Sequence, residues 1–297
     1  MKPSSFRYES PHSVEEASAL LAQHGDECKL LAGGQSLGPL LNLRMSTPEV
    51  LVDLRNIPEL RRPPRLTERG VEIPAMTTYQ DLMLSGVVGH VPLLAEAIPF
   101  VGHQGIRNVG TIGGSASHAD PTAEVPAVLL AMGADVVVQS QSTSRTIPAQ
   151  DFFTGVFSTS LADDELVTSL ILPTCSGRGA AAWAEVAPRH GDYAIVGAGA
   201  VLELERGKVA GVAVALSGVT DTPFACRCVS GLVGAAPSDS RIAEVARAAA
   251  GEIEPRGDLV ASAEYKNHLI ELLVADVLRT AWRRVRLALA EGEEAHR

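Results

Sequence analysis

Long hydrophobic runs, an excess of positive charge and cysteine pairs with C-x-x-C spacing are all missing from this sequence. The longest uncharged apolar stretch, residues 125–134, has about half of the roughly 20 residues that a membrane-spanning helix needs. Lys and Arg number 25 against 35 Asp and Glu, so the formal net charge is -10. These absences exclude a membrane span and a basic surface of the kind that binds nucleic acid.

Cysteine and histidine patterns typical of metal sites are also absent. No C-x-x-C pair is present, and His118 and His190 have no second histidine at H-x-x-x-H spacing, whereas zinc and iron–sulfur sites use closely spaced ligands. We therefore expect reduced, mostly buried thiols and no metal site in this chain. The N-terminal residues lack the apolar segment of a secretory signal, which predicts a cytoplasmic location. The cysteines are Cys28, Cys175, Cys226 and Cys228.

Glycine, in contrast, is plentiful. The chain has 27 Gly against 2 Trp, 4 Tyr and 6 Phe, a balance that favours binding sites lined by backbone rather than by aromatic side chains. Its 297 residues are 46% hydrophobic, which is enough to bury a full core. A prior of ~150 residues per domain suggests about two domains.

The N-terminal region has the pattern of a small α/β unit. A capping box, Ser13-x-x-Glu16, predicts a helix over residues 14–23. Short apolar runs predict buried strands at 28–31 and 50–54, and the first runs directly into the glycine-rich residues 32–38.

The middle region alternates strands and helices around a second glycine-rich stretch. Residues 101–115 have few periodic apolar positions, which predicts an extended loop. Residues 174–179 are the best linker candidate. The pattern predicts strands at 70–73, 134–139 and 166–172, and helices at 78–85, 92–97 and 123–132.

Beyond the linker the pattern changes. Alternating runs at 194–204 and 209–216 flank a short polar turn, which predicts an antiparallel hairpin. Two helices are predicted after it, at 238–250 and 263–290.

The first glycine-rich segment permits two interpretations. Gly34-x-Ser36-x-Gly38 fits the G-x-S-x-G elbow of a serine hydrolase, but Pro39 and the short apolar run after it fit the required long helix poorly. Alternatively, adjacent glycines with positive φ let backbone N–H groups converge in a nest that binds phosphate, or they form a plain tight bend.

A second segment repeats this chemistry. Residues 110–115, Gly-Thr-Ile-Gly-Gly-Ser, again place paired glycines between hydroxyl side chains. Two such nests would clamp the two phosphates of a dinucleotide. The carboxylates Asp120 and Glu124 that follow suit sugar hydroxyls, although Asp120 also fits as an ordinary acid at a helix N-terminus.

Taken together, the motifs resemble a known family. In chain order they are LAGGQSL at 31–37, GTIGG at 110–114 with HADP at 118–121, R-x-GDYA at 189–194 and SAEY at 262–265. They resemble the FAD-binding medium subunit of the molybdenum hydroxylases, which include carbon monoxide dehydrogenase, xanthine dehydrogenase and bacterial N-heterocycle hydroxylases. The resemblance spans almost the whole chain.

The resemblance implies an α+β fold with two domains. A PCMH-type FAD-binding domain of two α/β subdomains would occupy residues 1–175, with the subdomains at about 1–55 and 56–175. A C-terminal domain of antiparallel sheet plus helices would occupy residues 180–290.

The resemblance also implies which residues bind FAD. The two glycine segments would wrap the pyrophosphate from opposite sides, while Val101, Asp120, Glu124 and Leu161 would contact ribityl, ribose or ring atoms. The full set is Ala32, Gly33, Gly34, Gln35, Ser36, Leu37, Val101, Thr111, Ile112, Gly113, Gly114, Ser115, Asp120, Glu124 and Leu161.

Some positions have competing roles or depart from the family pattern. Val101 and Leu161 also fit as ordinary core residues, and Tyr193 fits either as a shield over one flavin face or as simple packing. Ser115 stands where Asn is usual, and Glu185 stands where Lys is common. The second departure puts a cationic contact to the flavin at that position in doubt.

The function that the resemblance implies is electron transfer. FAD would take electrons from [2Fe-2S] clusters on a small partner subunit and pass them to an external acceptor. A molybdopterin cofactor on a large subunit would hydroxylate the substrate, and the complex would be a heterohexamer, a dimer of heterotrimers. A stand-alone flavin oxidoreductase, a non-catalytic interaction protein and the Ser36 hydrolase are the rival functions.

Overall fold

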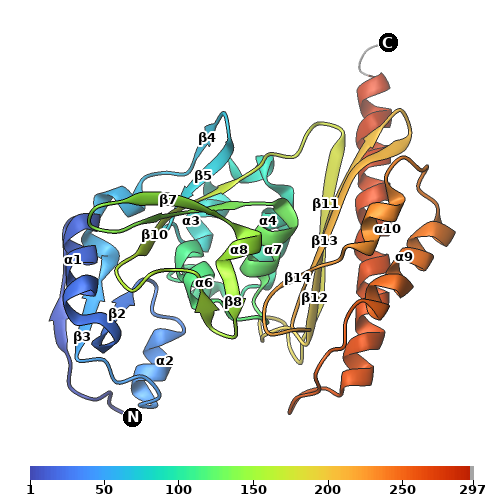
Figure 1. Cartoon of the computed structure of the whole chain (residues 1–297). Helices are drawn as coiled ribbons and strands as arrows, with labels where there is room; N and C mark the ends of the chain where they lie inside the picture. The colour runs from blue at the N-terminus through green and yellow to red at the C-terminus, as the bar shows by residue number, and fades with distance from the viewer. Residues whose placement is uncertain (295–297) are drawn as a thin grey trace. The chain divides into compact units, whose positions relative to one another are not determined.

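The structure is a computed structural model that describes residues 1–294 (Figure 1). The chain forms two compact units that interleave in sequence, and each is described by itself. The first unit contains residues 1–87, 103–119 and 134–172. The second contains residues 88–102 and 120–133, with the described residues from 173 onward.

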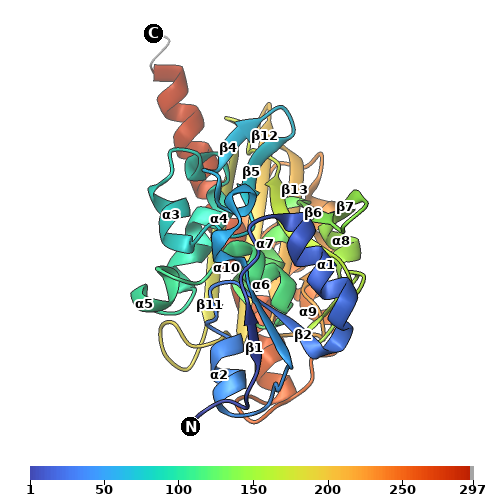
Figure 2. The same cartoon turned by 90° about the vertical axis from the view of Figure 1, so that its left-hand side faces the viewer.

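A small parallel sheet opens the first unit. Its strand order is β1 (Arg7–Glu9), β3 (Val50–Asp53), β2 (Cys28–Leu31). Helix α1 (Val14–His24) lies beside it (Figure 2). The predicted Ser13 cap is present, because its hydroxyl accepts from the Glu16 amide at 3.1 Å. The Glu16 carboxylate accepts from the His12 amide at 2.8 Å, one residue before the position that a capping box uses.

An antiparallel five-stranded sheet completes the first unit. Its order is β4 (Arg65–Thr67), β5 (Gly70–Pro74), β10 (Leu166–Leu172), β6 (Asp135–Gln139), β7 (Ser144–Pro148). The other elements of this unit are α2 (Leu37–Asn42), α3 (Tyr79–Leu84), α5 (Gln104–Arg107), α6 (Ile112–His118), α8 (Ala149–Phe152), β8 (Phe153–Gly155) and β9 (Ser158–Thr159), with 3-10 turns between them.

The second unit is built on a four-stranded antiparallel sheet in the order β11 (Gly179–Val186), β12 (Val196–Glu205), β13 (Lys208–Ser217), β14 (Phe224–Ala225). Helices α4 (Pro92–Ala97) and α7 (Glu124–Met132) contact one face. Helices α9 (Asp239–Gly251) and α10 (Ala263–Glu294) cover the other (Figure 1).

The α+β class, with a C-terminal antiparallel sheet plus helices, is confirmed. The hairpin and both C-terminal helices are also confirmed, within a few residues at their ends. Among the described helices, none is long and apolar enough to cross a lipid bilayer.

One expectation is wrong. The stretch 101–115 is not an extended loop, because it contains α5 and the start of α6. The Thr111 hydroxyl caps α6 by accepting from the Gly114 amide at 3.1 Å, which supports helix formation despite the paired glycines. The linker candidate 174–179 does lie between β10 and β11, at the boundary of the two units, and overlaps a strand only at Gly179.

Candidate functional site

The first glycine segment connects β2 of the parallel sheet to α2. Gly34 has φ of +68°, so this position favours glycine. Within residues 1–294, no protein acceptor is bonded to the backbone N–H groups of Gly34, Gln35 or Ser36, all of which lie in this turn. These three backbone N–H groups are donors of the kind that the predicted phosphate-binding turn needs.

The second glycine segment is the first turn of α6, and its backbone donors are already used. The amide of Ile112 donates to the Thr77 carbonyl at 3.1 Å, and that of Gly113 donates to the Ala75 carbonyl at 3.0 Å. Neither Gly113 nor Gly114 has a positive φ. The predicted second backbone nest is therefore wrong. The hydroxyl groups of this segment belong to Thr111, which is buried and caps α6, and to Ser115, which is half-buried.

The two glycine segments lie against each other in the first unit. A Cβ atom at Gly33 would lie 2.3 Å from the Val109 carbonyl oxygen and 2.8 Å from the Gly110 Cα. A Cβ atom at Gly114 would lie 3.5 Å from the Ala32 Cβ. Residues 32–37 and 111–115 are thus neighbours, although almost eighty residues separate them in sequence.

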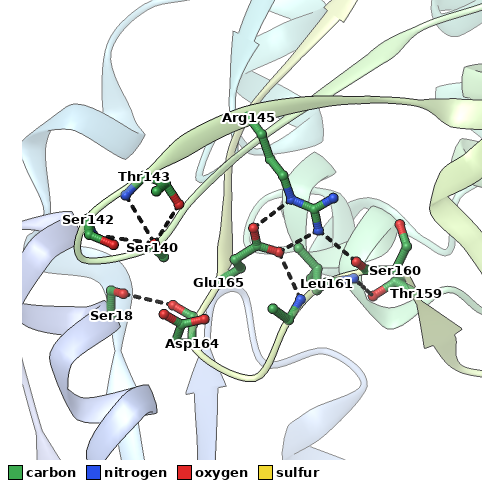
Figure 3. A network of polar contacts seen from close by, with 11 residues as sticks. Ser18, Ser140, Ser142, Thr143, Arg145, Thr159, Ser160, Leu161, Asp164 and Glu165 are labelled. Atoms are coloured by element: carbon green, nitrogen blue, oxygen red, sulfur yellow. Dashed lines mark hydrogen bonds and ion pairs between the residues drawn. The ribbon is translucent and has the colours of Figure 1, made fainter.

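Leu161 lies in the same unit, in the irregular segment between β9 and β10 (Figure 3). Both of these strands contact α6. Its side chain is half-buried and is not part of the buried core. The serine-hydrolase alternative gains no support here, because Ser36 precedes α2, which has only 6 residues.

In the second unit, the segments of Val101 and Tyr193 are neighbours. Gly191 has φ of +87°, and a Cβ atom there would lie 2.8 Å from the carbonyl oxygen of Gly102. The rings of Phe100 and His190 stack at 5.8 Å with an interplanar angle of 5°. No sequence pattern predicted this close contact between the two backbones, although Gly191 inside the R-x-GDYA motif was an available signal.

The Tyr193 ring is well exposed, with a relative accessibility of 59%. Asp120 is buried, and its Oδ1 accepts from the Thr122 amide at 2.9 Å and from the Thr122 hydroxyl at 2.6 Å. Asp120 thus caps a local turn before α7 instead of standing in the first turn of the helix, and its other carboxylate oxygen takes no part in these two bonds.

Glu124 is the first residue of α7 and is only 6% exposed. Burial, together with the charges of Glu185 and Asp120, raises the pKa of its carboxyl group to about 8. The Glu124 side chain is therefore mainly protonated at neutral pH and can donate a hydrogen bond as well as accept one.

Glu185 on β11 is the position where the family pattern often has Lys. Its Oε2 accepts from the indole Nε1–H of Trp183 at 3.0 Å. Burial raises the pKa of the Glu185 carboxyl, and the indole bond opposes that rise. Glu185 thus supplies no cation, and its negative charge acts on Glu124 instead.

The predicted site residues therefore form two groups, one in each unit. The first unit holds Ala32, Gly33, Gly34, Gln35, Ser36, Leu37, Thr111, Ile112, Gly113, Gly114, Ser115 and Leu161. The second holds Val101, Asp120, Glu124 and Tyr193.

Comparison with known families assigns both parts of the chain. Residues 4–175 match the model of the FAD binding domain in molybdopterin dehydrogenase, and residues 181–281 match the CO dehydrogenase flavoprotein C-terminal domain. The chain belongs to the family of FAD-binding medium subunits of the molybdenum hydroxylases, as the motifs indicated.

Individual relatives match over nearly their whole length. The 6-hydroxypseudooxynicotine dehydrogenase complex subunit alpha of Paenarthrobacter nicotinovorans is 39% identical over 96% of this chain and 97% of its own. The carbon monoxide dehydrogenase medium chain of Hydrogenophaga pseudoflava is 37% identical over 96% and 99%.

Solved structures of molybdenum hydroxylases have chains with the same fold as this one. A carbon monoxide dehydrogenase structure from Hydrogenophaga pseudoflava superposes with a TM-score of 0.93 at 37% identity, covering 96% of this chain and 99% of that one. Quinoline 2-oxidoreductase from Pseudomonas putida 86 gives 0.91 at 33% identity, with the same coverage of both chains.

Proposed function

We propose that this chain is the FAD-binding electron-transfer subunit of a molybdenum hydroxylase complex. Electrons would reach its FAD from iron–sulfur clusters of a partner subunit and leave to an external acceptor. Membership of the family supports this role, and so do relatives whose names describe them as medium chains or subunits.

The observation that carries the proposal is the meeting of the two glycine segments beside unpaired backbone donors. The amides of Gly34, Gln35 and Ser36 and the hydroxyls of Ser36, Thr111 and Ser115 fit a diphosphate in chemistry. Asp120 and Glu124 fit sugar or ribityl hydroxyls, and Val101, Leu161 and Tyr193 offer apolar surface. When bound, FAD supplies the redox chemistry, while the protein residues bind and orient it.

The partners in this proposal are a small iron–sulfur subunit and a large molybdopterin subunit, arranged as a cytoplasmic dimer of heterotrimers. The thiols of this chain are poor candidates for cluster ligands, because ligands are thiolates. Burial raises the pKa of Cys175 and that of Cys228 to about 11, which keeps both protonated at neutral pH. We also propose residues 1–175 and 180–290 as the two functional domains.

Replacement of Gly33 tests the site. We expect Gly33→Ala to lower the FAD content of the purified protein at least about fivefold, since its Cβ would overlap the Val109 carbonyl and separate the two segments. FAD released on heating, measured per chain, is the readout.

Gly38→Ala is the matched control, because a Cβ atom there has no neighbour within 4 Å and the residue lies in the same stretch of chain. It should retain FAD. A wild-type protein that binds no added FAD would overturn the proposed function, whereas unchanged FAD binding in Gly33→Ala would overturn the placement of the site at the two glycine segments. Co-purification of the native protein with a cysteine-rich small subunit and a large subunit tests the partners.

A further inference from the structure

The segment that carries Leu161 has no regular secondary structure, yet an ion pair holds it on both sides (Figure 3). Arg145 on edge strand β7 donates through Nε to Glu165 Oε1 at 2.7 Å and through Nη2 to Glu165 Oε2 at 2.7 Å. This is a two-point guanidinium–carboxylate pair, the geometry that fixes orientation as well as contact.

The same pair reaches the backbone immediately before and after Leu161. Arg145 Nη2 also donates to the Ser160 carbonyl oxygen at 2.9 Å. Glu165 Oε2 also accepts from the Ala162 amide at 2.8 Å. Both peptide groups that flank Leu161 in the chain are therefore tied to one ion pair.

Further bonds hold the rest of the segment. The Ser18 hydroxyl on α1 donates to the Asp164 carbonyl at 2.7 Å, and the Ser160 amide donates to the Phe152 carbonyl at 2.9 Å. The backbone of the segment is thus fixed, while the Leu161 side chain stays outside the buried core.

Glu165 is well suited to act as a permanent anchor. Its side chain is 6% exposed, and that of Arg145 is 47% exposed. The hydrogen bonds from Arg145 lower the pKa of the Glu165 carboxyl, with a smaller contribution from the Ala162 amide, despite the opposing effect of burial. The carboxylate therefore remains ionised across the neutral range and keeps all three bonds.

We propose that Arg145 and Glu165 are positioning residues that hold Leu161 against the bound flavin. This inference rests on the proposed function, because it needs this chain to bind FAD. Neither residue touches the cofactor in this proposal; both act through the backbone on either side of Leu161.

The test compares three variants of the purified holoprotein: Arg145→Gln, Leu161→Ala and the double variant. We expect each single change to weaken FAD affinity about tenfold, and the double variant to be no weaker than either, because the two changes remove one interaction. The visible circular dichroism of bound FAD, at saturation, should change in the same way in all three.

Arg65→Gln is the matched control. Arg65 makes a similar pair with Glu72, through Nε at 3.0 Å and Nη2 at 2.6 Å, on β4 and β5 at the opposite edge of the same sheet. It should leave FAD affinity and the flavin spectrum unchanged. The melting temperature of each variant separates a loss of folding from a loss of positioning.

Three outcomes would overturn the proposal: Arg145→Gln binding FAD as the control does, additive effects in the double variant, or an unchanged flavin spectrum. If Arg145→Gln does not fold, Arg145→Lys takes its place, since lysine keeps the positive charge but cannot make the three hydrogen bonds that Arg145 makes through Nε and Nη2. Failure of the wild-type protein to bind FAD would instead overturn the proposed function itself.

Discussion

Glu124 is a buried carboxyl group at the start of a helix, next to other acidic side chains. Because its pKa is raised from 4.5 to about 8, the folded state binds a proton that the unfolded state releases in that interval. Its contribution to stability is therefore fully present below about pH 4.5 and is lost as the pH rises through about 8.

Replacement of Glu124 by Gln should remove this pH dependence. Between about pH 5 and about pH 9, the free energy of unfolding of the wild type should fall by up to about 4 kcal/mol relative to Glu124→Gln. Chemical denaturation of both flavin-free proteins at several pH values measures this difference in the free energy of unfolding. The exposed Glu68→Gln variant is the control, and parallel curves for the wild type and Glu124→Gln would contradict the prediction.

The glycines of the two segments show which structural roles of a single residue can be predicted from the sequence and which cannot. The sequence singles out the pairs at 33–34 and 113–114, and the structure constrains both. Their physical roles differ, however: Gly34 needs its positive φ, whereas Gly33 and Gly113 allow close backbone approach to Val109 and Ala75. Such contacts join distant parts of the chain, so no local pattern predicts them.

Strand β12 accommodates a large ring from its neighbour. A Cβ atom at Gly199 would lie 2.9 Å from Trp183 Cε3 and 3.2 Å from Leu93 Cδ1, so the glycine leaves the space that the indole fills. This packing joins β11, β12 and α4 on one face of the second sheet. A side chain at this position would displace the ring.

We expect Gly199→Ala to lower the free energy of unfolding by about 2 kcal/mol, the usual cost of overpacking a tight core. Urea denaturation measures the loss. Gly211→Ala on β13 is the control, because its Cβ would make only an ordinary contact of 3.5 Å with Glu203. Equal stability of the two variants would contradict the role given to Trp183.

The start of α10 is anchored by a buried lysine. Lys266 is 5% exposed, and its Nζ donates to the Gly218 carbonyl at 2.9 Å and pairs with Asp258 Oδ2 at 2.7 Å. The hydrogen bond from Lys266 is the main cause that lowers the pKa of Asp258 from 3.8 to about 2. The pair stabilises the fold above about pH 3.8, and this stabilisation is lost as the pH falls through about 2.

Lys266→Met should lower the free energy of unfolding by about 1–3 kcal/mol at neutral pH, because the buried Gly218 carbonyl loses its donor. Acid titration followed by circular dichroism is the measurement. The wild type should lose more stability than the variant between about pH 4 and about pH 2. A variant as stable as the wild type at neutral pH would show that the anchor is dispensable.

Elements with strong periodicity were predictable, and those defined by distant contacts were not. Helix α1 and strands β2 and β10 follow their local patterns closely. Strand β11, with the sequence GAAAWAEV, was missed because small residues give no alternation, and its pairing with β12 decides its conformation. Edge strand β7 was missed because its side chains are mostly exposed.

The whole molecule is divided in a way that the linear sequence conceals. Helices α4 and α7 precede residue 175 but belong to the second unit, where they contact strands β11 to β13. Most of their apolar side chains are buried there, and Leu93, Leu94 and Leu129 are fully so.

A fragment of residues 1–175 should therefore expose these helices. We expect it to be recovered mainly as aggregate, or to bind a hydrophobic dye such as ANS far more strongly than the full chain does. Size-exclusion chromatography with dye fluorescence measures both. A monomeric fragment with a cooperative melting transition would contradict this expectation and would favour independent folding of the first 175 residues.

The interleaved order also sets a sequence of events on the ribosome. The first unit has all of its residues once residue 172 has left the exit tunnel, whereas the second still lacks the strands that α4 and α7 cover. Until β11, β12 and β13 have been translated, the apolar side chains of these two helices cannot be buried against that sheet. The period between the synthesis of α7 and the synthesis of β13 is the stage at which a nascent chain of this kind most needs a chaperone.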